Sequence, residues 1–379
     1  MKTSHKLLRL LSLSLPLVGW RAPVMMLHGM DRAGRKVRLL AAGYENFTGY
    51  VASRLFAGEF LTEDLGRVPL WRLARFLEDK LPSADLAVTG IDALSTSRFL
   101  GTGWLRCPAW AGSEVATPSE PARMLIPNDD WRLIRNKPFE YSESTQAADF
   151  DEFYDRYYEP FVRARHGALV FVRHRWELRA RFRRGLIQWL HRDGLRVAGG
   201  LVSLREGVVE LIASGVLDGR MELRRYGTAN ALYFHALELA RRRGCHTVFF
   251  GASRPSLHDS VWRNKRRWGA SLRLHPEMLF DMALRWNRLD GAVADFLSHT
   301  SLVHHDRGGV SGLWVCPPGT ASSGAALQKE IRRLSAPGLR RLHVVIPSAS
   351  ADRPQMPDVR WIDQEAVAAG GPQLLPLHD

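Results

Sequence analysis

The sequence predicts a mixed α/β protein in which a mostly antiparallel central sheet is flanked by helices. Two turn triplets, Arg192-Asp193-Gly194 and Arg205-Glu206-Gly207, separate three short apolar runs, as in a meander of hairpins. A long helical pattern and a further apolar run follow, and such alternation is typical of a sheet covered by helices. The predicted strands of the meander are 186–190, 197–204 and 208–214.

The helical pattern after these strands runs from about Thr228 to Arg243. Its apolar residues recur on one stripe, and three arginines at its end complement the helix dipole. Gly244 is a typical C-terminal stop. We expect a buried strand over 247–250, a second helix over 257–267 and a last strand after Gly269. The apolar stripe consists of Ala229, Leu232, Ala236, Leu239 and Ala240.

The N-terminal half carries a second α/β pattern and the C-terminal tail a third. Residues 101–121, rich in Gly, Pro and Ser, predict a loop or boundary. The other predicted elements are strands at 37–41, 86–91, 123–126, 312–315 and 342–346, and helices at 70–81, 149–165 and 325–334. We divide the chain into an N-terminal apolar segment (1–35), an α/β half (36–148), a main domain (149–300) and a small α/β appendage with its tail (301–379).

Charge and cysteine usage limit the partners and the compartment. The formal net charge of +14 and the pI near 10.2 indicate an anionic partner, which phosphates, nucleic acid or acidic lipid would satisfy equally. Cys107, Cys245 and Cys316 lie far apart without a CxxC pair, which favours a reducing compartment and argues against a structural metal site. The predicted location is the cytoplasm.

The N-terminus combines basic residues with an apolar run. Lys2, Lys6 and Arg9 precede the run 10–18, which resembles the h-region of a signal peptide, yet no small-x-small cleavage site follows. The run is shorter than the roughly 20 residues that a membrane span needs. The favoured interpretation is a peripheral helix at the inner face of the membrane, and a signal peptide is the alternative.

An arginine-rich segment spans residues 163–184. It contains eight arginines against one acid, Glu177, interleaved with Phe171, Trp176 and Phe182. Such a pattern suits a phosphate-rich partner such as nucleic acid. A solvated helix face beside a basic cofactor site explains it equally well.

The turn 224–229 is predicted to lie where a strand leads into a helix N-terminus. Unsatisfied backbone N–H groups and the positive end of the dipole make such a position an anion site. Gly227 lacks the side chain that would block a pyrophosphate, and Ala229 keeps the next turn narrow. Arg224 and Arg225 add positive charge. We therefore expect this turn to bind a phosphate-bearing ligand.

Two segments resemble a known superfamily. Arg224-Arg225-Tyr226-Gly227-Thr228-Ala229 resembles the [Arg/Gln]-x-x-Gly-x-[Gly/Ala] pattern of the GNAT acyl-CoA N-acyltransferases. Asn264–Ala270 resembles the Lys-x-x-Trp-Gly signature of their BioF2-like and Fem-type branch, and Phe249–Ser253 resembles that branch's final core strand and its exit. The resemblance covers about Phe150 to Pro276. It implies a GNAT-like sheet, with the N-terminal half as a degenerate first unit of two in tandem.

The resemblance implies direct transfer of an acyl group from acyl-CoA to an amine, with no metal. The amine acceptor would be an amino sugar or a similar compound of envelope or polysaccharide synthesis. Because donor and acceptor react in one cleft, positioning supplies much of the rate. The residues implied to bind the donor are Arg224, Arg225, Tyr226, Gly227, Thr228, Ala229 and Asn230. Tyr226 equally fits a packing role, and Asn230 a role in satisfying the turn.

The implied catalytic residues are Glu210, Lys265 and His258. GNAT proteins often carry a general base on the strand that contains Glu210, although the polar face of a half-buried strand explains this residue equally. Lys265 lies four residues before Gly269, where many GNAT enzymes have a tyrosine acid, so it departs from the pattern. A lysine there would stabilise a thiolate or phosphate by its charge.

Further candidates follow the buried strand 247–250. Ser253, His258 and Asp259 lie where a cleft would open, and Ser253, Asp259 and Trp268 are the predicted substrate contacts. Trp262 and Trp268 fit the core, with Trp268 bordering the site. His304 and His305, followed by Asp306, are candidate metal ligands. They lack a third convergent ligand at a recognisable spacing, so we expect a solvated loop there.

Two other functions remain open. A Fem-type enzyme would take an amino acid from aminoacyl-tRNA, which the basic segment suits. A non-catalytic nucleic-acid or membrane-surface protein on a GNAT scaffold would explain the missing tyrosine acid. The intact turn 224–229 favours acyl-CoA over both. No stable protein partner is indicated.

Overall fold

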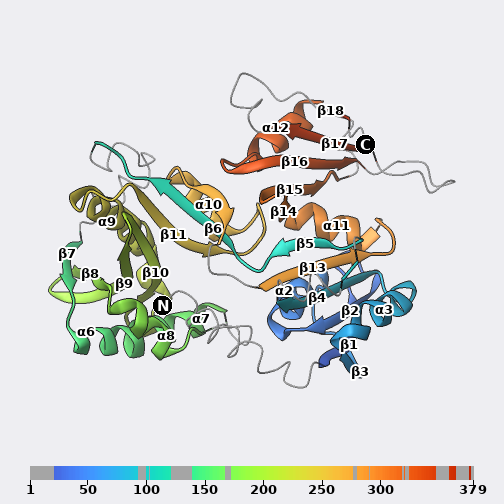
Figure 1. Ribbon diagram of the computed structural model, residues 1–379, viewed down its shortest axis with the longest axis horizontal. Helices are drawn as coiled ribbons and strands as arrows, with labels where there is room; N and C mark the ends of the chain where they lie inside the picture. The colour runs from blue at the N-terminus through green and yellow to red at the C-terminus, as the bar shows by residue number, and fades with distance from the viewer. Residues whose placement is uncertain are drawn as a thin grey trace. The chain divides into compact units, whose positions relative to one another are not determined.

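The computed structural model describes two compact units (Figure 1). The first unit comprises Met1–Ala111, Ser253–Trp262 and Leu272–Asp379, and the second comprises Gly112–Ala252 and Arg263–Ser271. The residues whose structure is described are 21–92, 100–101, 103–120, 139–166, 172–275, 280–289, 291–317, 320, 324–346, 358–363 and 375–376.

A six-stranded sheet organises the first unit, in the order β3-β1-β2-β4-β13-β5. The pair β2 and β4 is parallel, whereas the other neighbours are antiparallel. The strands are β1 (Arg21–Met30), β2 (Lys36–Gly43), β3 (Leu61–Pro69), β4 (Leu86–Asp92), β5 (Leu105–Pro108) and β13 (Phe280–Trp286). The helices of this region are α2 (Glu45–Leu55), α3 (Leu70–Lys80) with the 3-10 turn η2 (Leu81–Ser83), and α11 (Gly291–Thr300).

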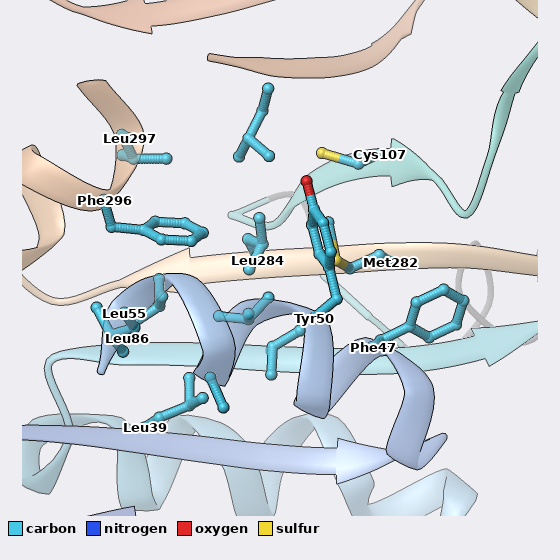
Figure 2. Close-up of a cluster of buried hydrophobic side chains, with 14 of the residues drawn as sticks. Leu39, Phe47, Tyr50, Leu55, Leu86, Cys107, Met282, Leu284, Phe296 and Leu297 are labelled. Atoms are coloured by element: carbon cyan, nitrogen blue, oxygen red, sulfur yellow. The ribbon is translucent and has the colours of Figure 1, made fainter. Parts of the chain in front are cut away.

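Both faces of this sheet are buried because apolar side chains fill both sides of its central strands. On β2, Leu39 and Ala41 join the cluster formed with α2 and α11, whereas Leu40 and Ala42 join the cluster formed with α3. Successive side chains of a strand point to opposite faces, so a continuous apolar run requires cover on both. Figure 2 shows the first cluster, where side chains of α2 and α11 converge on the sheet.

A five-stranded sheet in the order β14-β15-β16-β17-β18 completes the first unit. Its strands are β14 (Leu302–Asp306), β15 (Gly309–Val315), β16 (Leu339–Ile346), β17 (Asp358–Asp363) and β18 (Leu375–Pro376). β15 and β16 are parallel and are connected through α12 (Gly324–Leu334). Leu313 and Val315 of β15 and Val345 of β16 pack into the α2 and α11 cluster, so the two sheets of this unit share a core.

The second unit contains the sheet order β6-β11-β10-β9-β8-β7. The strands are β6 (Ala111–Ala116), β7 (Glu140–Ser144), β8 (Gly185–Arg192), β9 (Leu195–Arg205), β10 (Val208–Val216) and β11 (Thr247–Ser253), and β12 (Ser271–Leu274) follows them in the chain. The helices are α6 (Ala147–Glu152), the π-helix η4 (Phe153–Tyr158), α7 (Glu159–His166), α8 (Arg175–Phe182), the 3-10 helices η6 (Leu217–Gly219) and η7 (Met221–Tyr226), α9 (Thr228–Arg242) and α10 (Ser260–Arg267).

Tight turns fix the meander β8-β9-β10. Asp193 and Gly194 have φ values of 53° and 75°, and Glu206 and Gly207 have 49° and 75°. Positive φ at both central residues is the mark of a primed hairpin turn, whose twist matches the flanking strands. The predicted hairpins, and the helix that follows them, are confirmed.

The predicted mixed α/β class, with mostly antiparallel sheets flanked by helices, is confirmed. Of the loop or boundary predicted over 101–121, the loop was wrong, because β5 and β6 lie there. The division between the two units does fall within this segment, between Ala111 and Gly112. β5 is only four residues long and β6 consists mostly of small residues, so neither shows a clear period. The strand predicted at 123–126 and the apolar run 10–18 lie outside the described residues. Within the described chain, no helix is both long and apolar enough to span a bilayer.

Acid should destabilise the first unit through His343 on β16. Burial, assisted by the nearby His304 and Arg341, lowers the pKa of His343 to about 4 from an ordinary 6.5. The unfolded chain therefore binds the proton more tightly, and stability present above pH 6.5 is lost as the pH falls toward 4. We expect the free energy of unfolding from urea titrations to fall on the order of 1 kcal/mol between pH 7.5 and 5 through this group.

His343→Gln should reduce that pH dependence. An equal loss of stability on acidification in His343→Gln and the wild type would show that His343 is not responsible.

Candidate functional site

Two neighbouring parallel strands, β10 and β11, separate soon after they begin. They pair only over Val208–Glu210 and Thr247–Phe249 within the described residues. Beyond Glu210 the pairing of β10 with β9 shifts register between Leu211 and Ala213, which indicates a bulge. Backbone polar groups that lose their strand partner need another partner. Ligands of α/β sheets bind outside the carboxyl ends of strands, where neighbouring connections diverge.

Gly251 lies where β11 departs from β10. Its φ of 73° lies in the left-handed region, and a Cβ there would lie 3.0 Å from the carbonyl oxygen of Leu211. Any other residue would therefore be strained in backbone and crowded against β10. The sequence signalled this position as a glycine after a buried strand, but it did not predict its role in separating the strands.

Gly227 starts α9 in the left-handed conformation, with φ 82° and ψ 23°. Its N–H donates to the Arg224 carbonyl oxygen at 3.0 Å, and its own carbonyl accepts from the Ala231 N–H at 2.9 Å. Because glycine has no side chain, Gly227 makes no side-chain cap for the first turn of α9. The structure thus places Gly227 at the start of α9, where the sequence predicts an anion site, and binding of an anion there stays a prediction.

The approach to this turn differs from the prediction. β10 does not lead directly into α9, because the 3-10 helices η6 and η7 intervene. Arg224 and Arg225 are exposed in the last turn of η7, where their charge adjoins the start of α9. Tyr226 is half-buried with the Arg192 guanidinium 4.1 Å from its ring centroid, a packing contact. Thr228 is buried and Ala229 half-buried in the first turn of α9.

Two side chains of α10 tie together the elements around this region. The Asn264 amide nitrogen donates to Oδ1 of Asn230 in the first turn of α9, at 3.0 Å. Lys265 is only 2% exposed, and its ammonium donates to the carbonyl oxygen of Ala252 near the end of β11, at 2.8 Å. Asn264 was not among the predicted site residues. The contacts fix the start of α9 and the end of β11 to one helix.

Trp262 and Trp268, on either side of Asn264 and Lys265 in the chain, are core residues, as predicted. Trp262 is 1% exposed and Trp268 is fully buried. Trp268 meets Tyr233 of α9 edge-to-face, with ring centroids 6.0 Å apart, and Tyr233 lies 4.5 Å from Phe250 of β11. A substrate contact for Trp268 stays a prediction.

Glu210 occupies the last residue pair that joins β10 to β11. Its side chain is half-buried, and Oε2 lies 3.5 Å from a guanidinium nitrogen of Arg181 on α8. The Glu210 side chain thus lies on the face of the sheet that α8 covers. The side chain of the next residue, Leu211, lies on the opposite face, near Leu232 of α9 and Gly200 of β9. A role for Glu210 as general base stays a prediction.

The remaining predicted residues belong to the first unit and make local contacts there. Ser253 is buried, and its hydroxyl reaches the Ala111 carbonyl oxygen at 3.5 Å. His258 is half-buried, and its backbone N–H donates to the Ser256 hydroxyl at 3.2 Å. Asp259 accepts bonds from the N–H groups of Val261 and Trp262 at 3.0 and 2.9 Å. Asp259 is therefore the N-cap of α10.

Acidic partners in the same unit neutralise much of the arginine-rich segment. Arg175 pairs with Asp151 at 3.1 Å and also with Asp155, and Arg179 pairs with Asp151 at 2.9 Å. Arg163 likewise pairs with Glu159 at 2.6 Å. Counting charges within 163–184 missed these acids because they precede the segment in the chain. The finding favours the interpretation as a solvated helix face.

The solvated loop expected at 304–306 was wrong, because these residues end β14. His305 lies 2.8 Å from an Asp281 carboxylate oxygen, and Asp306 accepts the Ser311 hydroxyl at 2.7 Å. In the described part of the chain, no group of three or more metal-binding side chains converges.

Comparisons with known proteins give only distant structural likenesses. No family model and no curated protein matches the sequence. FemX is similar over 72% of this chain and 90% of its own length, with 10% identity and a TM-score of 0.36. L-PGS from Bacillus licheniformis is similar over 69% of this chain and 84% of its own, at 12% identity and a TM-score of 0.33. A GCN5-related N-acetyltransferase from Sphaerobacter thermophilus is similar over 69% of this chain and 81% of its own length, with 13% identity and a TM-score of 0.31. At such scores these likenesses carry no conclusion about activity.

The capping contacts of Asp259 predict a structural effect. Asp259→Ala should lower the stability of the protein by about 1 kcal/mol, because α10 loses its N-cap. Asp259→Asn should retain stability, since asparagine caps equally well. Thermal unfolding of both variants measures this difference, and an alanine variant as stable as the asparagine variant would argue against the cap.

Proposed function

We propose that this protein is an N-acyltransferase that binds an acyl-CoA donor where β10 and β11 separate. The supporting observation is the combination, in one unit, of the strand separation after Glu210 and the left-handed Gly227 that starts α9 without a capping side chain. The strand edges offer backbone groups to the amides of the donor's extended arm, and the α9 N-terminus offers N–H groups to its pyrophosphate. Arg224 and Arg225 add charge beside it.

The reaction requires few side chains. The nitrogen of the acceptor amine attacks the thioester carbonyl carbon, the C–S bond breaks, and the nitrogen loses a proton. Glu210 accepts this proton, directly or through one water molecule. The buried charge of Lys265, bound to the Ala252 carbonyl, stabilises the departing thiolate electrostatically. An amino sugar or a similar amine is the proposed acceptor.

An aminoacyl-tRNA donor is less well supported. A tRNA needs an extended surface of available positive charge. Three of the arginines that suggested it, Arg163, Arg175 and Arg179, are paired with acids of their own unit. The donor site at α9 is compact by comparison and suits a pyrophosphate.

Gly227→Glu should abolish binding of acetyl-CoA. The side chain would place a carboxylate at the α9 N-terminus, where it fills the anion site and repels the pyrophosphate. The matched control is Gly244→Glu, which adds the same charge beyond the opposite end of α9, also at a positive φ and with open space around it. Each change costs about 1–2 kcal/mol of backbone strain.

Calorimetric titration of both variants and the wild type with acetyl-CoA and longer acyl-CoAs measures the effect. Binding retained by Gly244→Glu and lost in a folded Gly227→Glu supports the donor site. Wild-type protein that binds none of these thioesters would contradict the proposed function.

Glu210→Gln should lower kcat for acetylation of a responsive amine about 100-fold or more, without changing acetyl-CoA affinity. Amino sugars form the first panel of acceptors. Arg181→Gln removes the ion-pair partner of Glu210 and retains the carboxylate, so most activity should survive. If Glu210→Gln kept wild-type kcat across the pH range, another group would have to be the base.

A further inference from the structure

Arg254, in the first unit, contacts two aromatic rings. Its guanidinium carbon is 4.3 Å from the ring centroid of Trp110 and 5.0 Å from that of Tyr50 on α2. Burial lowers the pKa of Arg254 from its ordinary value. Desolvation of a cation is costly, and the faces of two aromatic rings offset only part of that cost. The arrangement holds the planar guanidinium in one orientation.

The positive charge at this place is not balanced by an ion pair. No hydrogen bond or ion pair of the Arg254 guanidinium is found among the described residues. A second cation, Arg54, lies 4.4 Å from the Tyr50 ring centroid. The acid that acts on both Tyr50 and Arg254 is Asp259, and its Oδ1 already caps α10. The acid whose charge acts on Arg254 therefore already uses one of its oxygens as the cap of α10.

Tyr50 supplies a second, independent observation. Its side chain is 4% exposed, and its hydroxyl has no hydrogen-bond partner within the described structure. Figure 2 shows the ring rising from α2 with the hydroxyl oxygen directed toward Cys107 on β5. Burial raises the pKa of Tyr50 to about 12, so the hydroxyl stays protonated and is a hydrogen-bond donor at neutral pH. A buried hydroxyl without a hydrogen-bond partner lowers stability unless a ligand accepts its hydrogen bond.

We propose that Arg254, Arg54 and Tyr50 form a binding site for a small oxyanion, a carboxylate or a phosphate group of a metabolite. The guanidinium fork matches two oxygens of either group, and its rings preorganise it for that geometry. The Tyr50 hydroxyl donates a further hydrogen bond. The ligand supplies negative charge in addition to that of Asp259. This site lies in the first unit and is independent of the proposed donor turn.

Calorimetric titration with inorganic phosphate and, separately, with sodium acetate at constant ionic strength tests the proposal. Each probe is also titrated into Gly227→Glu, so that phosphate bound at the α9 N-terminus is not mistaken for binding here. We expect saturable binding of one or both probes in that variant, weakened at least about tenfold by Arg254→Gln and by Tyr50→Phe. Arg72→Gln, at an exposed position of α3, removes the same charge and should change nothing.

Two further measurements separate binding from a structural role. Arg254→Lys keeps the charge but loses the fork, so it should bind more weakly than the wild type. Tyr50→Phe removes a hydroxyl without a partner, so without anion it should be at least as stable as the wild type in thermal unfolding. The proposal is overturned if neither probe binds, if Arg254→Gln and Arg254→Lys bind as the wild type does, or if Tyr50→Phe is clearly destabilised.

Discussion

The separation of β10 from β11 is the constraint on which the candidate site depends. Two parallel strands would ordinarily continue their hydrogen-bond ladder, yet here it ends after three residue pairs. The bulge at Leu211–Ala213 and the left-handed Gly251 divert one strand each. Lys265 then holds the carbonyl of Ala252, while Asn264 holds the start of α9. Through these two contacts, helix α10 holds the end of β11 and the start of α9 in place beside the point where β11 separates from β10.

Local patterns allowed much of the second unit to be predicted from the sequence. The triplets ending in Gly194 and Gly207 dictate tight turns, because few other residues accept positive φ there. The apolar stripe and the terminal glycine define α9 to within a residue of its observed end at Arg242. Such features depend on neighbours in the chain, so periodicity and turn chemistry reveal them.

Features that depend on distant residues could not be predicted in this way. β13 lies between β4 and β5 in the sheet, although residues 109–279 separate it from β5 in the chain. β5 is also too short for a recognisable period. Asp259 shows the same limit for the site. A carboxylate after a buried strand is equally suited to catalysis or to capping, and only the bonds to Val261 and Trp262 reveal the cap. The same reasoning applies to Asp151, which pairs with Arg175 and Arg179 although it lies outside the arginine-rich segment 163–184.

The net charge of +14 does not by itself identify a ligand, because the field at a given place depends on which arginines are paired with acids. Arginines of 163–184 that are paired with neighbouring acids add little to the field felt by a ligand, because each pair is nearly neutral at a distance. Arg224 and Arg225 adjoin a helix N-terminus, and Arg254 contacts two aromatic rings and has no ion pair among the described residues. Both places combine positive charge with donors fixed in direction, which selects for small anions with defined geometry. An extended polyanion would instead need many available cations along one surface. The pairing of these arginines therefore supports the proposed small anionic ligands over nucleic acid as the reason for the basic segment 163–184.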